Sequence, residues 1–160
     1  MAARSERAGC AACAHRQPEL PAKPEAVFNL LISPKAIRGR WDQVGAVITE
    51  LDGVWIFAWG ERESDPDYVT GARIKSFTAP QRVILAYEYA RSRAGILPFA
   101  AAMTAEFTIQ KITAGSVLRV TQSGFPPQGQ SDGFYEACGQ GWRAALQGIG
   151  TILTPPPKKR

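Results

Sequence analysis

The stretch "ELDGVWIFAWGERE" (Glu50–Glu63) decides the interpretation of this sequence, because the central residues of the stretch are apolar at every position. A half-buried strand alternates apolar and polar side chains, since successive side chains point to opposite faces of a sheet. The Asp52-Gly53 pair before the apolar run is a strong turn signal. We therefore predict a strand that follows this turn and is apolar on both faces. One face carries Trp55, Phe57 and Trp59, and the other carries Val54, Ile56 and Ala58.

Segments of the same kind lie on both sides of this strand. They are rich in β-branched and aromatic residues and are bounded by Gly, Pro, Asp or Ser, as strands usually are. In one of them Met103, Ala105 and Phe107 alternate with polar residues. The short connections between consecutive strands indicate an antiparallel meander. The six predicted strands are 46–51, 54–63, 68–77, 82–90, 103–112 and 117–123.

Helical segments flank the meander. Residues 12–20 are predicted to form a short first strand, which Pro18 places at a sheet edge. Pro24 then opens a helix, and Ser33-Pro34 separates it from a second short helix that ends near Gly39. Later in the chain the apolar spacing changes to three and four, which predicts a helix of about twenty residues that starts near Ser131 or Asp132. Its apolar face carries Tyr135, Cys138, Trp142, Leu146, Ile149 and Leu153.

Four glycines lie inside this long helix, although each costs about 1 kcal/mol relative to alanine. They are Gly139, Gly141, Gly148 and Gly150. A helix keeps glycines where a bulky neighbour lies close to its backbone, so tight packing on a curved sheet is the favoured interpretation. Space for a ligand is the alternative. The predicted organisation is a flexible segment 1–13, one α+β domain over 14–153, and a basic Pro-rich tail 154–160.

The charge distribution argues against a nucleic-acid-binding function. The chain has 160 residues and a formal net charge of +5. The surplus lies in the first 23 residues and in the tail that ends with Lys158, Lys159 and Arg160, whereas residues 24–153 are balanced. A nucleic-acid binder would carry a basic patch on its folded body. No apolar run is long enough to span a membrane, and the first residues lack the apolar stretch of a secretory signal. We therefore expect a cytoplasmic protein that does not insert into membranes.

The three cysteines do not match a recognised metal or haem motif. "CAACAH" contains Cys10, Cys13 and His15, but haem attachment requires the histidine directly after the second cysteine. A structural zinc site usually has four ligands drawn as two pairs, and only Cys138 remains for the fourth position. The odd number of cysteines also argues against a disulfide framework. We predict neither a metal nor a cofactor.

The order of the predicted elements and several motifs resemble a known superfamily. A strand, two short helices, six strands and a long C-terminal helix follow each other as in the helix-grip fold. The segment 20–41, "LPAKPEAVFNLLISPKAIRGRW", resembles the opening of the SRPBCC superfamily of START-like and Bet v-like domains. "DGVWIFAW" is similar to the aromatic strand of the family named for the activator of heat shock protein 90 ATPase. The family's C-terminal motif is matched by Ser123-Gly124-Phe125, Phe134-Tyr135, Gly141-Trp142 and Leu146.

This resemblance implies a curved antiparallel sheet of about seven strands that wraps the long helix and leaves an apolar cavity between them. Gln122 stands where the family often has a histidine, which weakens any role there that requires titration. The alternative is that the aromatic side chains fill the interior completely and nothing binds. The residues placed at the cavity are Trp41, Trp55, Phe57, Trp59, Tyr87, Tyr89, Phe107, Gln122, Tyr135, Cys138 and Trp142.

Three functions are compatible with such a domain. The first is a carrier or sensor of a small hydrophobic molecule, in which tyrosine hydroxyls, Gln122 or Cys138 fix the orientation of the ligand. The second is an enzyme similar to polyketide cyclases or dehydratases, which would need a positioned acid or base. No such catalytic set is recognisable in the sequence, so the residues favour binding over catalysis without settling it. The third is a co-chaperone-like partner that stimulates a chaperone ATPase, as the family resemblance suggests.

The second apolar face of the aromatic strand predicts an interaction surface. Val54, Ile56 and Ala58 would lie outside the grip, where a contiguous apolar patch marks a site of association. The long connection 91–101 is a second candidate surface, because it contains the apolar "GILPF". We expect a homodimer through one of these two surfaces. The residues of the second candidate are Ile96, Leu97 and Phe99.

Overall fold

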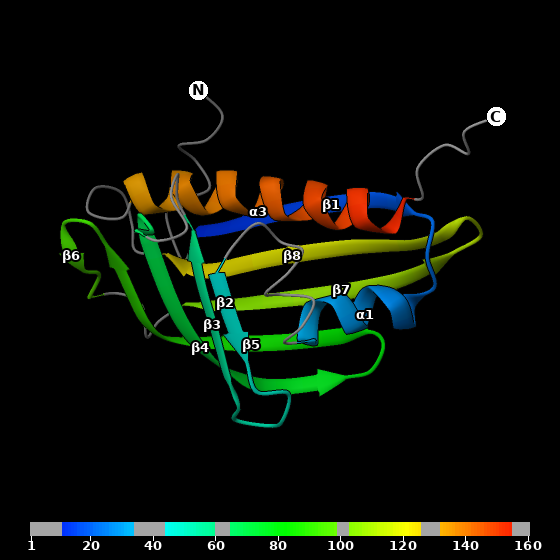
Figure 1. Ribbon diagram of the computed structural model, residues 1–160, viewed down its shortest axis with the longest axis horizontal. Coiled ribbons are helices and arrows are strands. Elements are labelled where there is room, and N and C mark those ends of the chain that lie inside the picture. The colour runs from blue at the N-terminus through cyan, green and yellow to red at the C-terminus, as the bar shows by residue number, and fades with distance from the viewer. Residues whose placement is uncertain (1–10, 34–43, 60–64, 99–102, 126–131, 155–160) are drawn as a thin grey trace.

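One antiparallel sheet curves around a long C-terminal helix in the computed structural model of the chain (Figure 1). The strands are ordered β1-β8-β7-β5-β4-β3-β2, and the short β6 pairs with β5. The structure describes residues 11–33, 44–59, 65–98, 103–125 and 132–154, with the backbone alone at 11–18, 44–45, 59 and 132. This arrangement confirms the predicted α+β helix-grip fold.

The elements follow the predicted order, with boundaries that differ by a few residues. Among the described residues the helices are α1 (Pro24–Ile32) and α3 (Asp132–Leu153), and the predicted second short helix lies outside those residues. The sequence did not predict β6, which folds within the 91–101 connection. The strands are β1 (Ala11–Leu20), β2 (Val44–Val47), β3 (Val54–Trp59), β4 (Tyr68–Thr78), β5 (Arg82–Ser92), β6 (Gly95–Ile96), β7 (Thr104–Ile112) and β8 (Gly115–Phe125).

Alternation along β7 and in the middle of β8 shows which face of the sheet is concave. Ala105, Phe107 and Ile109 of β7 are buried, whereas the residues between them are exposed or half-buried. Phe107 pairs with Val120 of β8, and Gln122 of the same strand is also buried. Since a shift by one residue would turn every side chain to the other face, this pattern holds the register of the two strands.

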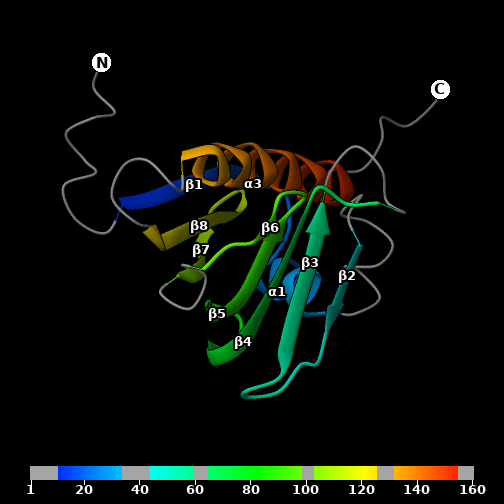
Figure 2. The ribbon, with the colours of Figure 1, turned by 90° about the vertical axis from the view of Figure 1, so that its left-hand side faces the viewer.

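α1 and α3 pack on the concave face of the sheet (Figure 2), where α1 lies against β7 and β8 and α3 lies along β1. The last carbonyl groups of α1 have no partner within the helix, as at any helix end. The Trp55 indole Nε1 donates to the Leu31 carbonyl at 3.4 Å, and the Thr49 hydroxyl donates to the Ile32 carbonyl at 2.6 Å. These bonds join the end of α1 to β3 and to the turn before it. Of the helices in the described ranges, none combines the length and apolarity needed to cross a bilayer.

A β-bulge in β5 corrects one prediction about the interior. Ala72 of β4 pairs with Tyr87, but its neighbour Gly71 pairs with Tyr89, so Glu88 is the extra residue on β5. A bulge shifts the alternation of side chains by one position. Tyr87 therefore points inward and is 4% exposed, whereas Tyr89 is 39% exposed. The prediction that both tyrosines face the interior is wrong for Tyr89.

The outer face of β3 differs from the prediction at one position. Ile56 is exposed and Val54 is half-buried, as expected for residues outside the grip. Ala58, in contrast, is buried, and it is in register with Val44 of β2 and Val69 of β4. Ala58 is therefore not available as an interface residue.

The 91–101 connection is anchored at its start by charge. The Arg93 guanidinium binds the carboxylates of Asp65, at 3.0 Å, and Asp67, and these contacts hold its pKa above the ordinary value. Leu97 is half-buried against the core, and its N–H donates to the Ala90 carbonyl. Ile96 is exposed, and Phe99 lies outside the described residues.

Gly148 of α3 lies in an open environment. A Cβ added at Gly148 would meet nothing within 4 Å, so the expected close approach of a neighbour is wrong at this position. We predict that Gly148→Ala raises the free energy of unfolding by about 1 kcal/mol, because alanine is the better helix former. Urea denaturation followed by circular dichroism measures this change.

Gly53 is the matched control, because a Cβ there would collide with the carbonyl oxygen of Ile48. Gly53→Ala should lower the free energy of unfolding by about 1–3 kcal/mol, as overpacking does. A loss of stability in Gly148→Ala would contradict the open environment of this glycine.

Candidate functional site

A small cavity lies between the concave face of the sheet and α3. Its volume is about 30 Å³, which is enough for one or two water molecules and far below that of a typical ligand pocket. It is contained between β3, β4, β5 and β8 on one side and α3 on the other. The lining residues are Trp55, Phe57, Thr70, Tyr87, Gln122, Cys138, Gly141, Trp142 and Ala145.

Stacked aromatic rings occupy most of the space around this cavity. The Trp55 and Phe57 rings are stacked with centroids 5.1 Å apart. The Phe107 ring lies 6.0 Å from Trp55 and meets Trp142 edge-on at 5.4 Å. Such offset and edge-on arrangements are the favourable ones for aromatic pairs. The rings therefore behave largely as core, and the space they leave is small.

Gln122 is a buried amide whose oxygen is used within the protein. Its side chain is on β8 and is 1% exposed. The Trp142 indole Nε1 donates to the Gln122 Oε1 at 2.8 Å, and the Gln122 Nε2 lies 3.8 Å from the sulfur of Met103. An unpaired indole or amide in this position would be unfavourable. The bond therefore holds α3 against β8 at the level of the cavity.

Tyr87 presents a buried hydroxyl at the cavity without a hydrogen-bond partner among the described residues. Buried polar groups in folded proteins nearly always have such a partner, so an exception needs an explanation. Burial, with a smaller contribution from Cys138, raises the pKa of Tyr87 well above its ordinary value. The hydroxyl therefore stays protonated at neutral pH and can donate a hydrogen bond.

The remaining polar groups at the cavity are weakly polar or already engaged. The Thr70 hydroxyl donates to the Phe57 carbonyl at 3.4 Å, and Cys138 is a buried thiol. All lining residues are uncharged. Among the described residues, no group of His, Cys, Asp and Glu is arranged to hold a metal ion. The arrangement suits a neutral occupant that meets rings on several sides and one hydroxyl.

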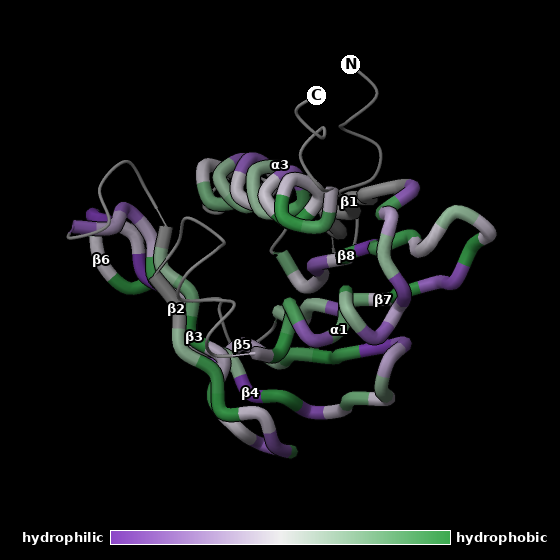
Figure 3. Tube along the Cα trace, turned by 45° about the vertical axis from the view of Figure 1, so that its right-hand side comes forward, coloured by the Kyte–Doolittle hydropathy of each residue, from purple (hydrophilic) through white to green (hydrophobic). Residues whose placement is uncertain are grey.

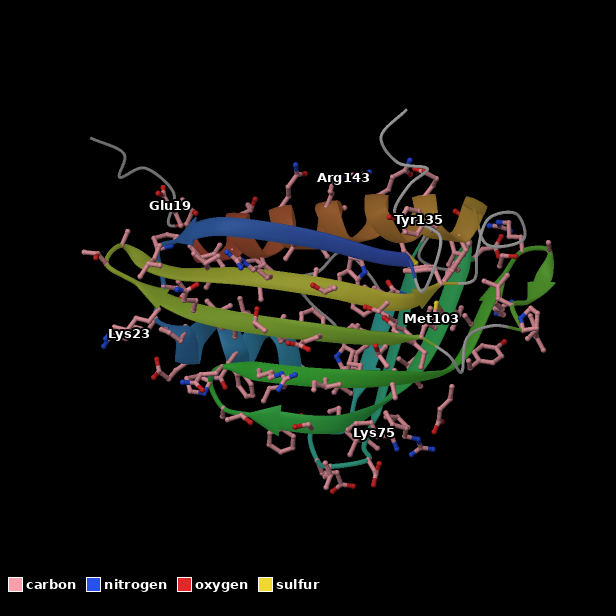
Figure 4. The ribbon with its side chains drawn as sticks, turned by 180° about the vertical axis from the view of Figure 1, so that it is seen from behind. Glu19, Lys23, Lys75, Met103, Tyr135 and Arg143 are labelled. Carbon is pink, nitrogen blue, oxygen red and sulfur yellow. The ribbon has the colours of Figure 1, made fainter. Side chains whose placement is uncertain are left out.

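Several predicted site residues lie elsewhere or outside the described part of the chain. Tyr135 packs edge-on against Phe125 at 5.0 Å, at the end of the sheet where Met103 lies (Figure 4), and does not line the cavity. Phe107 lies behind the lining residues, in contact with Trp55 and Trp142. Trp41 and the side chain of Trp59 lie outside what the structure describes.

Three lining residues were not predicted. Gly141 and Ala145 follow Cys138 by three and seven positions, so they lie on the same face of α3. Helical spacing from Cys138 would have found both. Thr70 pairs with Phe57 across β3 and β4, and only the register of these strands reveals that it points inward.

Comparisons with known proteins agree with this geometry. A solved structure from Chromobacterium violaceum has the same fold, with 19% identity and a TM-score of 0.65, and the match covers 91% of this chain and 99% of that one. A protein from Mesorhizobium loti matches with 15% identity and a TM-score of 0.69, over 89% of this chain and 96% of that one. The solution structure of the Aha1 dimer from Colwellia psychrerythraea also matches, with 16% identity and a TM-score of 0.68, over 89% of this chain and 95% of that one. Among curated proteins, none matches the sequence significantly. The profile of the family "Activator of Hsp90 ATPase homolog 1-like protein" matches residues 21–154, and the chain therefore belongs to this family, within the SRPBCC superfamily.

Proposed function

We propose that this chain is a small-molecule-binding domain. Its ligand is neutral and mostly apolar, carries one hydrogen-bond acceptor, and lies between the sheet and α3. The observation that carries the proposal is the Tyr87 hydroxyl, which lines the cavity, is buried and has no hydrogen-bond partner among the described residues. An occupant that accepts a hydrogen bond would remove the penalty of about 1–3 kcal/mol for an unsatisfied buried group.

The neutral character of the ligand follows from the lining. A charged molecule placed among these rings would lose its hydration without gaining an opposite charge, which is strongly unfavourable. A carbonyl, ether or hydroxyl oxygen meets no such barrier and can accept from Tyr87. Thr70 and Cys138 add weakly polar surface beside it.

The cavity must widen to hold more than a water molecule. Phe57 and Trp142 keep the largest exposed fractions among its aromatic residues, 7% and 8%. The Trp142 indole is held by its hydrogen bond to Gln122, so the Phe57 ring is the first to move when a ligand enters. Gly141 lines the same side and leaves room for such a movement. The resting volume of about 30 Å³ then describes the collapsed state of the site.

Stimulation of a chaperone ATPase is the second candidate, and the family match supports it. The family model is named for an activator of Hsp90 ATPase, and the Colwellia relative is named Aha1. This function would act through the surface of the domain. An ATPase assay of the chaperone in the presence of the wild-type chain distinguishes it from ligand binding, because Tyr87→Phe should not change a surface-mediated effect.

A matched pair of probes tests the role of Tyr87. Acetophenone and ethylbenzene have similar size and shape, but only acetophenone carries a carbonyl oxygen. We predict that the wild type binds acetophenone about threefold to tenfold more tightly, as one net hydrogen bond provides, and that Tyr87→Phe removes this preference. Titrations followed by two-dimensional NMR measure both dissociation constants.

Tyr68→Phe is the control for this pair, because Tyr68 packs against Phe134 and does not line the cavity. It should keep the wild-type preference for acetophenone. Equal preference in the wild type and Tyr87→Phe would contradict the proposal.

The free energy of unfolding of two ligand-free variants should show that the Tyr87 hydroxyl contributes little to stability, whereas the Gln122 amide contributes much. Tyr87→Phe removes a buried hydroxyl that has no hydrogen-bond partner among the described residues, so the free energy of unfolding should stay equal or rise by up to about 1 kcal/mol. Gln122→Leu leaves the Trp142 indole N–H unsatisfied and should lower the free energy of unfolding by about 1–3 kcal/mol. Urea denaturation of both variants, after extraction of any bound molecule, provides the comparison. A large loss of stability in Tyr87→Phe would show that the hydroxyl has a structural partner.

A further inference from the structure

The outer face of the sheet is divided into a polar and an apolar half. The outward positions of β7 and β8 carry polar or charged residues. The residues of β3 are, in contrast, mostly hydrophobic (Figure 3). The polar half consists of Thr104, Glu106, Thr108, Arg119, Thr121 and Ser123. The apolar half, which we name the β3–β4–β5 patch, consists of Val54, Ile56, Val69, Gly71 and Tyr89, with Glu88 at its border.

The β3–β4–β5 patch contains a groove of about 290 Å³. Gly71 forms its floor, because this residue pairs with Ile56 on one side and with Tyr89 on the other. The side chains of Ile56 and Tyr89 protrude on either side of Gly71 and are 40% and 39% exposed, respectively. The patch therefore combines protruding apolar side chains with a groove that is itself lined mostly by apolar residues.

Two ion pairs lie beside the groove, on the side of the molecule remote from α3, where Figure 4 shows Lys75. The Arg73 Nε is 3.2 Å from the Glu88 carboxylate, and the Lys75 ammonium is 2.8 Å from the Asp52 carboxylate. All four side chains remain largely exposed. Each pair presents one positive and one negative group to an approaching surface.

We propose that the β3–β4–β5 patch binds a second copy of this chain in a two-fold symmetric dimer. A two-fold axis places the same surface on both partners, so the surface must be complementary to itself. This patch meets that condition, since it holds both a ridge and a groove and both signs of charge. A partner with one dominant charge would meet as much repulsion as attraction at these two pairs.

In such a dimer the apolar ridge of each copy fills the groove of the other. Ile56 lies over Gly71 of the partner subunit, and Arg73 faces Glu88 of the partner subunit. The charged groups form the rim and fix the orientation, while burial of the apolar groove supplies most of the association energy.

Sedimentation velocity at tens of micromolar protein tests the proposed surface. The wild type should sediment as a dimer, and Ile56→Glu should sediment as a folded monomer, because a buried unpaired carboxylate opposes association. Thr108→Glu on the polar half of the same face is the matched control and should remain dimeric. A monomeric wild type, or a dimeric Ile56→Glu, would overturn the proposal.

A charge exchange tests the orientation without relying on one variant. Arg73→Glu and Glu88→Arg should each weaken self-association by about tenfold or more, since both rims then carry like charges. Mixing the two variants places opposite charges across the interface and should restore a heterodimer, which isotope labelling of one variant identifies by mass. Failure of the mixture to associate more tightly than either variant alone would overturn the proposed pairing.

Discussion

The contact between Trp142 and Gln122 is the interaction on which the interior depends. It joins the middle of α3 to β8 through a 2.8 Å hydrogen bond, and Phe107 meets the same indole ring edge-on. With Trp142 fixed in this way, the helix can present only one face to the sheet. Cys138, Ala145 and Ile149 lie on that face, and all three are buried.

The same packing explains why the cavity is both small and polar at one point. The rings of Trp55, Phe57 and Phe107 pack against one another beside the cavity, whose volume is only about 30 Å³. The Gln122 oxygen is occupied by Trp142, so it offers little to an occupant. Tyr87 is left as the lining hydroxyl that has no hydrogen-bond partner among the described residues. The function proposed for the domain rests on this division of polar groups.

Sequence periodicity predicted the strands and the long helix, and the family resemblance predicted how they assemble around an interior. The resemblance placed Trp55 and Phe57 inward, alternation placed Phe107 and Gln122 on the same side, and helical spacing placed Cys138 and Trp142 opposite them. All six are buried in the structure. Tyr89 was misplaced because a bulge adds one residue to β5, and nothing in "RVILAYEYA" marks that insertion. Thr70 was missed for a related reason, since its inward position follows from pairing with β3 and not from its own polarity. The packing role assigned to Gly148 failed because spacing cannot show whether a neighbour lies close to the backbone.

The central claim is that the interior of this family member holds a small molecule at Tyr87. Native mass spectrometry of the protein as purified, under gentle ionisation, tests it most directly. We expect the wild type to carry a small-molecule mass excess that disappears on denaturation, and Tyr87→Phe to carry a smaller occupied fraction. The bare mass in both proteins, at every ionisation energy used, would contradict the claim and favour a filled core with a role at the surface.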